Sequence, residues 1–152
     1  MSFNINDIKK LREETGAGVL EVKQALENAE GDYEKAKAEL MKKVAAKAAK
    51  KADRVTKDGL VESYIHAGGK VGSLVTLACE TDFVAKTDDF KKLAHEVAMQ
   101  VCTEEFENVD ELLNSEYIRD PGKKIKDLID EVVAKVGEKV EIREFTKFNV
   151  RA

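Results

Sequence analysis

The spacing of hydrophobic residues divides the chain into two parts that have different periods. In residues 1–55, apolar residues recur every three or four positions, which is typical of amphipathic helices. Three short helices are predicted there, over residues 4–14, 19–29 and 33–48. Gly16 favours the left-handed conformation that ends a helix, and Asp32 is a suitable N-cap for the third one. The first part is therefore expected to be a small three-helix bundle.

After Gly59 the period changes to two, which is typical of β-strands. Two such runs, "LVESYIH" and "KVGSLVTLAC", are joined by "AGG", so residues 60–79 are predicted to form a hairpin. Thr87 is a suitable cap for a helix that follows the hairpin. Helical spacing then continues in three stretches, residues 88–101, 110–117 and 125–136.

Residues 140–150 are predicted to be a third strand. The apolar residues expected on one face of it are Val140, Ile142, Phe148 and Val150. Phe145 is expected on the opposite face. Residues 56–152 are therefore predicted to be an α+β domain, a small three-stranded antiparallel sheet covered by helices. Residues 1–55 are predicted to be a separate N-terminal domain, and this domain ends in a basic helical connector.

The charge balance argues against a nucleic-acid partner. The chain of 152 residues has 26 basic and 30 acidic residues, whereas sequence-independent phosphate binding needs an excess of Lys and Arg. Within residues 42–57 a stripe of basic side chains is present: Lys43, Lys47, Lys50 and Arg54. A solvated helical connector is the main interpretation of this stripe, and a ribosome- or nucleic-acid-binding arm stays open as the alternative.

Nothing in the sequence predicts secretion or a membrane. The N-terminus has no apolar core of signal-peptide length, and no run of apolar residues is long enough to cross a bilayer. Cys79 and Cys102 have no metal-like spacing and lie in apolar-periodic segments, so they are interpreted as buried thiols in a reducing compartment. A cytoplasmic protein is expected.

The sequence contains no group of residues that is a candidate for catalysis. His66 and His95 lie on separate elements, and neither has a neighbour at metal-ligand spacing. The segments "GAG" and "AGG" lack the residues of a phosphate-binding loop. No enzyme activity, no cofactor and no metal site are therefore predicted.

Leu20 is one of two apolar features that the predicted fold does not explain. On a helical wheel it points away from Val22 and Leu26, and Val19 lies at the margin of their face. Single exposed leucines are common. The alternative is a protein contact made by Val19 and Leu20, with Arg12 near them across the turn.

Phe83 is the second such feature. It lies between the end of the hairpin, near Glu80, and the helix that begins at Thr87. Its ring either packs under the connection as part of the core or stands out as an anchor for a partner. Asp82 beside it is open to a purely structural role as a helix cap.

Several segments resemble the bacterial translation elongation factor Ts family. "LREETGAGVLEVKQALENAEGDYEKAKAEL" resembles the ubiquitin-associated-like N-terminal domain of that family, and "CETDFVAK" resembles its signature segment. "YIHAGGKVGSLV" and "VAKVGEKVEIREF" are similar to its hairpin and to its closing helix and strand. The resemblance implies a guanine-nucleotide exchange factor for the GTPase elongation factor Tu. An adaptor that binds ubiquitin or peptides without exchange activity is the alternative.

The resemblance also implies roles for residues of the "TDFV" segment. Thr81, Asp82, Phe83 and Val84 match the part associated with displacing the magnesium ion of Tu. Phe83 would be the ring that wedges between helices of the partner, and Asp82 would help to set the loop.

Docking contacts are implied at the N-terminal domain. Arg12, Val19 and Leu20 would bind the nucleotide-binding domain of Tu, although family members often have a methionine pair in place of Val19 and Leu20. His66 lies in the hairpin motif that the family also uses for contacts.

Residues 102–121 are a short replacement for a region that is longer in many family members. Those members carry a helical hairpin or a second copy of the core there, so the contacts of that region with Tu are in doubt. Short members of the family form homodimers, and a homodimer is expected. Phe145 on the face opposite to the other apolar residues of its strand is taken as consistent with this.

Overall fold

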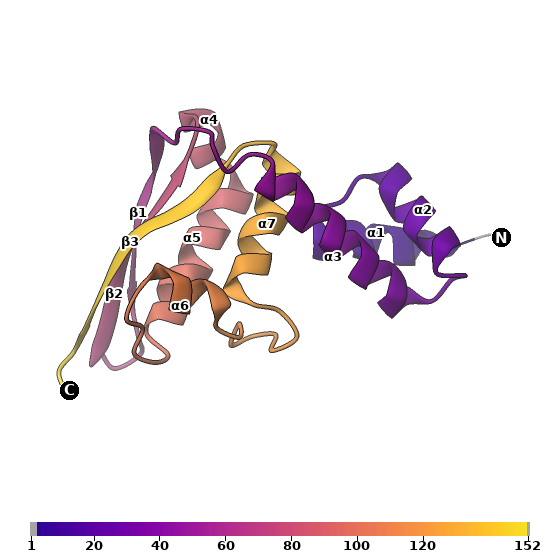
Figure 1. Ribbon diagram of the computed structural model, residues 1–152. Coiled ribbons are helices and arrows are strands. Elements are labelled where there is room, and N and C mark those ends of the chain that lie inside the picture. Colours follow the sequence, from indigo (N-terminus) through magenta and orange to yellow (C-terminus); the bar gives the residue numbers. More distant parts are fainter. Residues whose placement is uncertain (1–2, 152) are drawn as a thin grey trace.

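The computed structural model describes residues 3–151. Its elements follow in the order α1 (Ile5–Thr15), α2 (Val19–Asn28), α3 (Tyr33–Ala49), β1 (Asp58–Ile65), β2 (Val71–Cys79), α4 (Asp82–Ala85), α5 (Asp88–Val101), α6 (Val109–Asn114), α7 (Ile125–Val136) and β3 (Val140–Asn149). The three N-terminal helices lie beside a layered part in which helices pack on a sheet (Figure 1). The chain is therefore α+β, as the sequence predicts.

The N-terminal helices begin and end where local signals place them. The Asp32 side chain caps α3 by accepting a hydrogen bond from the Lys35 N–H at 3.1 Å, and Gly16 ends α1 in the left-handed conformation at φ +76°. The apolar faces of the three helices form a buried cluster of Leu11, Ala17, Val22, Ala25, Leu26, Ala36 and Leu40. Three amphipathic helices thus share one small core.

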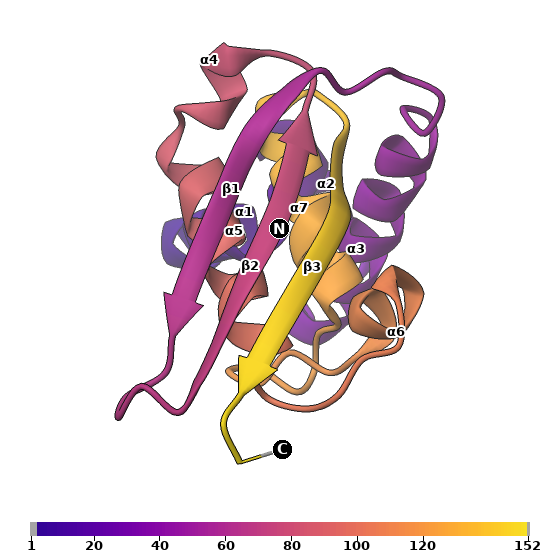
Figure 2. The ribbon, with the colours of Figure 1, turned by 90° about the vertical axis from the view of Figure 1, so that its left-hand side faces the viewer.

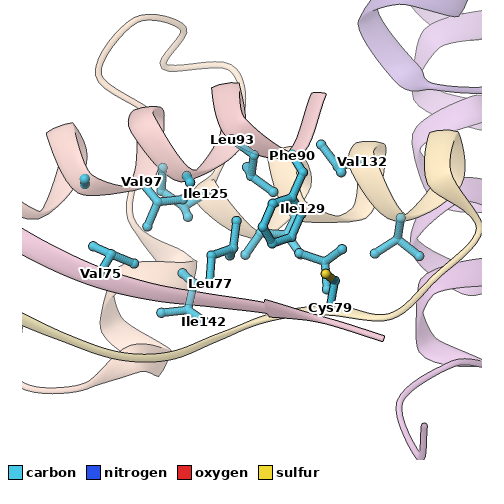
Figure 3. Packing of buried hydrophobic residues seen from close by; sticks show 14 of the residues in the cluster. Val75, Leu77, Cys79, Phe90, Leu93, Val97, Ile125, Ile129, Val132 and Ile142 are labelled. Carbon is cyan, nitrogen blue, oxygen red and sulfur yellow. The ribbon is translucent and has the colours of Figure 1, made fainter. Parts of the chain in front are cut away.

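The sheet has the strand order β1-β2-β3, and both pairs are antiparallel. Figure 2 shows that the helices lie behind the sheet, while its other face is bare. Side chains from β2, β3, α5 and α7 interdigitate between the layers (Figure 3), among them Val75, Leu77, Phe90, Leu93, Val97, Ile129 and Ile142. Burial of these apolar groups holds the sheet to its helices.

The prediction for the faces of β3 is wrong in one respect. Val140 and Ile142 face the core, but Phe148 and Val150 are exposed and Phe145 packs on the core side against Phe106. The register of β3 against β2 shifts between Thr76 and Leu77, because β3 contains one extra residue at this point. Such a bulge changes which face the following side chains take. Phe145 therefore gives no support to a dimer.

The bare face of the sheet is apolar in several places. Its exposed residues include Val61, Ile65, Leu74 and Phe148, and Val150 follows just beyond the end of β3. Contiguous exposed apolar residues are typical of surfaces that contact another protein.

One predicted helix is shorter than expected: α6 ends at Asn114 rather than at residue 117. α3 ends at Ala49, one residue beyond its predicted end, so the basic connector is helical only up to this point and Arg54 lies beyond the helix. The basic stripe makes contacts within the chain: Lys43 pairs with Glu39, Lys47 with Glu21 and Arg54 with Glu80. Much of this positive charge is thus matched by neighbouring carboxylates. Within residues 3–151, no helix combines the length and the hydropathy that a membrane crossing needs.

Gly16 marks a close approach between α1 and α7. A Cβ atom at this position would lie 2.5 Å from the Glu131 carbonyl oxygen and 3.3 Å from the Ala134 Cβ. The first distance is shorter than atoms tolerate, and the carbonyl belongs to backbone that cannot turn aside. Only glycine allows the end of α1 to lie against α7.

Gly16→Ala is expected to lower the free energy of unfolding by about 3 kcal/mol, since a left-handed alanine costs 1–2 kcal/mol and the contact with α7 adds to it. Gly137 is the matched control: it ends α7 at φ +74°, and a Cβ there would meet nothing within 4 Å. Gly137→Ala should therefore cost only about 1 kcal/mol. Urea denaturation of both variants measures the difference, and equal losses would contradict the close packing.

Asp130 is a half-buried carboxyl group on α7 with no hydrogen bond or ion pair to the described residues. Burial raises the pKa of Asp130 from 3.8 to about 6. Between these two pH values the folded protein keeps a proton that the unfolded chain has released. Its protonated form therefore favours folding at low pH, and this advantage is lost as the pH rises through about 6.

Asp130→Asn is expected to raise the free energy of unfolding by about 1 kcal/mol at pH 7.5, a value reduced for solvent screening of a half-exposed group, and to give no gain at pH 4. Asp53→Asn, at an exposed position, should leave stability unchanged at both pH values. Thermal unfolding at the two pH values checks this, and a gain that does not depend on pH would contradict it.

Candidate partner-binding site

The segment between β2 and α5 contains a single helical turn, α4, which the sequence did not predict. Thr81 is its N-cap, and the Thr81 hydroxyl accepts a hydrogen bond from the Val84 N–H at 3.4 Å. Val84 is buried beneath the turn, whereas the Phe83 side chain is 81% exposed. The alternative in which Phe83 fills the core is therefore wrong.

Asp82 does not cap the turn. It is the first residue of α4, and its carboxylate pairs with the Lys86 ammonium at 3.2 Å on the exposed side. An exposed pair of this kind adds little stability. The capping role belongs to Thr81, one residue earlier.

Glu138 holds the start of this segment, and the sequence analysis missed it. One of its carboxylate oxygens accepts hydrogen bonds from the Thr81 N–H at 3.0 Å and the Glu80 N–H at 3.2 Å, and the other accepts from the Thr81 hydroxyl at 2.7 Å. Glu80 in turn accepts from the Lys139 N–H at 2.7 Å. Two glutamates thus tie the α4 loop, residues 80–86, to the connection between α7 and β3.

Cys79 supports the loop from below. Its thiol donates a hydrogen bond to the Thr81 carbonyl, with an S–O distance of 3.1 Å. Burial, and secondarily the charge of Glu138, raise the pKa of the Cys79 thiol to about 11. The thiol therefore keeps its proton at neutral pH and remains a donor, so the loop that presents Phe83 is fixed from several sides.

Arg12, Val19 and Leu20 lie together at the junction of α1 and α2. All three are exposed, and Leu20 is 80% exposed, whereas the apolar residues further along α2, Val22, Ala25 and Leu26, are buried. A groove of about 670 Å³ runs beside them between the N-terminal helices and the layered part. Arg12, Lys135 and Asp89 line it, and Asp89 is in the first turn of α5. The groove thus extends from the α1–α2 turn to the helix that follows the α4 loop.

His66 lies at the other end of the sheet. It is exposed in the β1–β2 turn, where its Nδ1 is 3.2 Å from the Tyr64 hydroxyl. Figure 2 shows this turn and α4 at opposite ends of the strands. β1 has 8 residues, which at 3.3 Å each span about 26 Å. Within one chain the structure therefore does not bring His66 and Phe83 together.

The part of the chain that the structure describes contains no candidate metal-binding site. No cluster of three or more His, Cys, Asp or Glu residues there could hold an ion. His95 is exposed on α5, and its ring lies edge-on to Tyr64 with centroids 5.6 Å apart. The prominent features are exposed apolar side chains on fixed backbone, which suit contact with another protein.

Comparison with known proteins decides the family. Residues 80–152 match the family model "Elongation factor TS". The chain is 40% identical to "Elongation factor Ts" of Thermotoga neapolitana over 193 aligned residues, covering 99% of this chain and 98% of the relative. It is 39% identical to the Herpetosiphon aurantiacus protein of the same name, covering 99% and 98% of the two chains.

The chain belongs to the elongation factor Ts family. This membership extends over both parts of the chain, since the relatives are matched along nearly their whole length. The alignment with the Thermotoga elongation factor Ts has 193 positions, whereas this chain has 152 residues, so internal gaps fall in this chain. The chain is shorter than this relative, and its "TDFV" segment lies within the region that the family model matches.

Proposed function

We propose that this protein is a guanine-nucleotide exchange factor, which binds elongation factor Tu with GDP and speeds the release of GDP in translation elongation. The observation that carries the proposal is Phe83, an exposed ring on a helical turn held from below, in a chain of the elongation factor Ts family. A fixed aromatic side chain is well suited to insert into a partner, because little conformational freedom is lost on binding.

Thr81, Asp82, Phe83 and Val84 form the part of the proposed site that acts on the nucleotide. Phe83 enters between helices of Tu, Thr81 and Val84 hold the turn, and Asp82 orients it with Lys86. The Mg²⁺ ion of Tu neutralises charge on the phosphates of GDP, so moving the elements that hold this ion weakens nucleotide binding. The coupling is reciprocal: a factor that weakens GDP binding is itself bound less tightly when GDP is present.

Residues 1–55 serve in this proposal as a ubiquitin-associated-like docking domain, and residues 56–152 as the core domain. Arg12, Val19 and Leu20 make the docking contact, supported by their common exposure at one turn. No covalent bond is made or broken in the reaction, so this chain needs no cofactor. The reaction belongs to protein synthesis in the cytoplasm.

A second copy of the chain is proposed to cover the bare face of the sheet. Val61, Ile65, Leu74 and Phe148 make that face apolar, and a homodimer would remove them from water. It would also add a second His66, which one chain places far from its own Phe83. Sedimentation equilibrium tests this, and a monomer at micromolar concentration would contradict it.

Release of a fluorescent GDP analogue from Tu, with and without this protein, tests the exchange function. Acceleration by orders of magnitude is expected, because each 1.4 kcal/mol of barrier lowering gives a tenfold rate. Absence of acceleration by the folded protein, together with binding to ubiquitin or to a peptide, would favour the adaptor alternative.

A further inference from the structure

We propose that Lys123 is a positioning residue, which fixes the α1–α2 turn relative to the α4 loop. The assignment rests on the function proposed above, because it concerns how two separate contacts with one partner are kept in register. Lys123 touches neither contact itself and acts through the end of α1.

The Lys123 side chain is unusual in its burial. It is only 9% exposed, and its ammonium lies 2.5 Å from the Glu131 carboxylate and 2.8 Å from the Glu14 carbonyl oxygen. A lysine is rarely buried to this extent unless its charge is fully paired. Glu131 belongs to α7, whereas Glu14 is in the last turn of α1, so one ammonium group joins the two parts of the molecule.

The end of α1 offers a natural acceptor for this charge. The last carbonyls of a helix lack partners within it and carry its negative dipole end. The Lys123 ammonium donates to the Glu14 carbonyl, and the Lys135 ammonium from α7 donates to the Glu13 carbonyl at 3.3 Å. Gly16 then lets the backbone lie directly against the Glu131 carbonyl. Three contacts thus fix the same turn of α1.

Lys123 is itself held in place. Its N–H donates to the Asp120 carbonyl at 2.9 Å, and its carbonyl accepts from the Tyr117 N–H at 2.8 Å. The position of its ammonium is therefore set by backbone on one side and by Glu131 on the other. Such a group can transmit the position of α7 to α1.

The turn that Lys123 fixes leads directly into two of the proposed docking residues. Val19 and Leu20 come directly after it, separated from Gly16 only by Ala17 and Gly18. Phe83 belongs to the layered part, with its own core. A partner that binds both places at once gains fully only if their separation is already correct, because ordering two loosely joined parts costs binding free energy. Without Lys123 both binding contacts remain, but the α1–α2 turn loses the buried one of the contacts that set its position relative to Phe83.

Lys123→Met is the test variant, and Lys147→Met is its matched control. Lys147 is buried to a similar extent, at 11% exposed, and it also pairs with a carboxylate and donates to a carbonyl, those of Glu105 and Glu104. All partners of Lys147 lie within the layered part. Both variants lose an ammonium that pairs with a carboxylate and donates to a carbonyl, but only the first loses a contact with the N-terminal helices. Glu131 is 12% exposed and Glu105 is 81% exposed, so only the first also leaves a buried carboxylate without its partner.

Residual dipolar couplings of backbone amides in the full chain report the orientation of the two parts. One alignment tensor is expected to fit α1–α3 together with the sheet in the wild type and in Lys147→Met. In Lys123→Met the couplings of α1 and of the α1–α2 turn are expected to depart from the tensor that fits the sheet. If Lys123→Met is poorly folded because Glu131 stays charged, Lys123→Met with Glu131→Met removes both charges. A single tensor for the folded variant would overturn the assignment.

Exchange kinetics supply the second readout. Lys123→Met is expected to lower kcat/KM for GDP release from Tu by about tenfold, as misplaced contacts do, and Lys147→Met to leave it unchanged. In a Leu20→Ala background the same change should cost less than about twofold, since the contact that it positions is already lost. A full tenfold loss in that background would overturn the assignment.

Failure of the proposed function would look different. If the wild type does not accelerate GDP release, the exchange function fails while the couplings remain measurable. Those couplings then decide alone whether Lys123 fixes the N-terminal helices.

Discussion

Phe83→Ala is expected to slow GDP release from Tu by about a hundredfold at saturating exchange factor, because truncating an aromatic anchor costs about 3 kcal/mol and each 1.4 kcal/mol is tenfold. The ring is 81% exposed, so its removal leaves no cavity and the melting temperature should stay within a degree or so of the wild type. Stopped-flow release of the fluorescent analogue measures the effect.

Ile5→Ala is the matched control for this experiment. Ile5 is exposed to nearly the same extent, at 79%, but it lies at the start of α1, away from the α4 loop. In the presence of Ile5→Ala, Tu should release GDP at the rate seen with the wild-type exchange factor. If Phe83→Ala also retains the wild-type rate, Phe83 is not the group that acts on the nucleotide, and the site assignment fails although the exchange function stands.

Glu138→Ala is expected to lower the rate of GDP release by about tenfold and the free energy of unfolding by about 2 kcal/mol, because three hydrogen bonds from the α4 loop lose their acceptor. Phe83 keeps its ring in this variant but presents it from a loosened loop. The two effects are measured by GDP release and by urea denaturation.

Glu141→Ala separates these effects. Glu141 is also half-buried and accepts a hydrogen bond from Thr56 at 2.9 Å, but its polar partners, Thr56, Lys139 and Arg143, all lie outside the α4 loop. Glu141→Ala should lower the free energy of unfolding and leave the rate of GDP release unchanged. Equal loss of exchange in both variants would mean that destabilisation alone explains the result for Glu138.

Local signals allowed much of the fold to be predicted. Asp32 and Thr87 cap helices as expected, and Gly137 closes α7 in the left-handed conformation. These residues act on the backbone within four positions of themselves, so their effect is legible in a short window of sequence. The exposure of Leu20 could also be anticipated, because its position on the helical wheel depends only on its neighbours.

Contacts between distant segments could not be predicted. The bulge in β3 depends on how that strand pairs with β2, far earlier in the chain, and periodicity alone does not report the extra residue. Glu138 and Lys123 look like ordinary charged residues in the sequence. Their importance comes from the backbone groups that the fold brings to them, those of Thr81 and Glu14.

The bulge in β3 also bears on how the protein avoids aggregation. β3 is an edge strand, and an open edge is a template on which another strand can add. At the bulge the regular ladder is interrupted, and Arg143 donates hydrogen bonds to the hydroxyl and the carbonyl of Thr56. The neighbouring Glu144 and Lys147 add charge along the same edge. The β3 edge of this sheet is therefore a poor template for the addition of another strand.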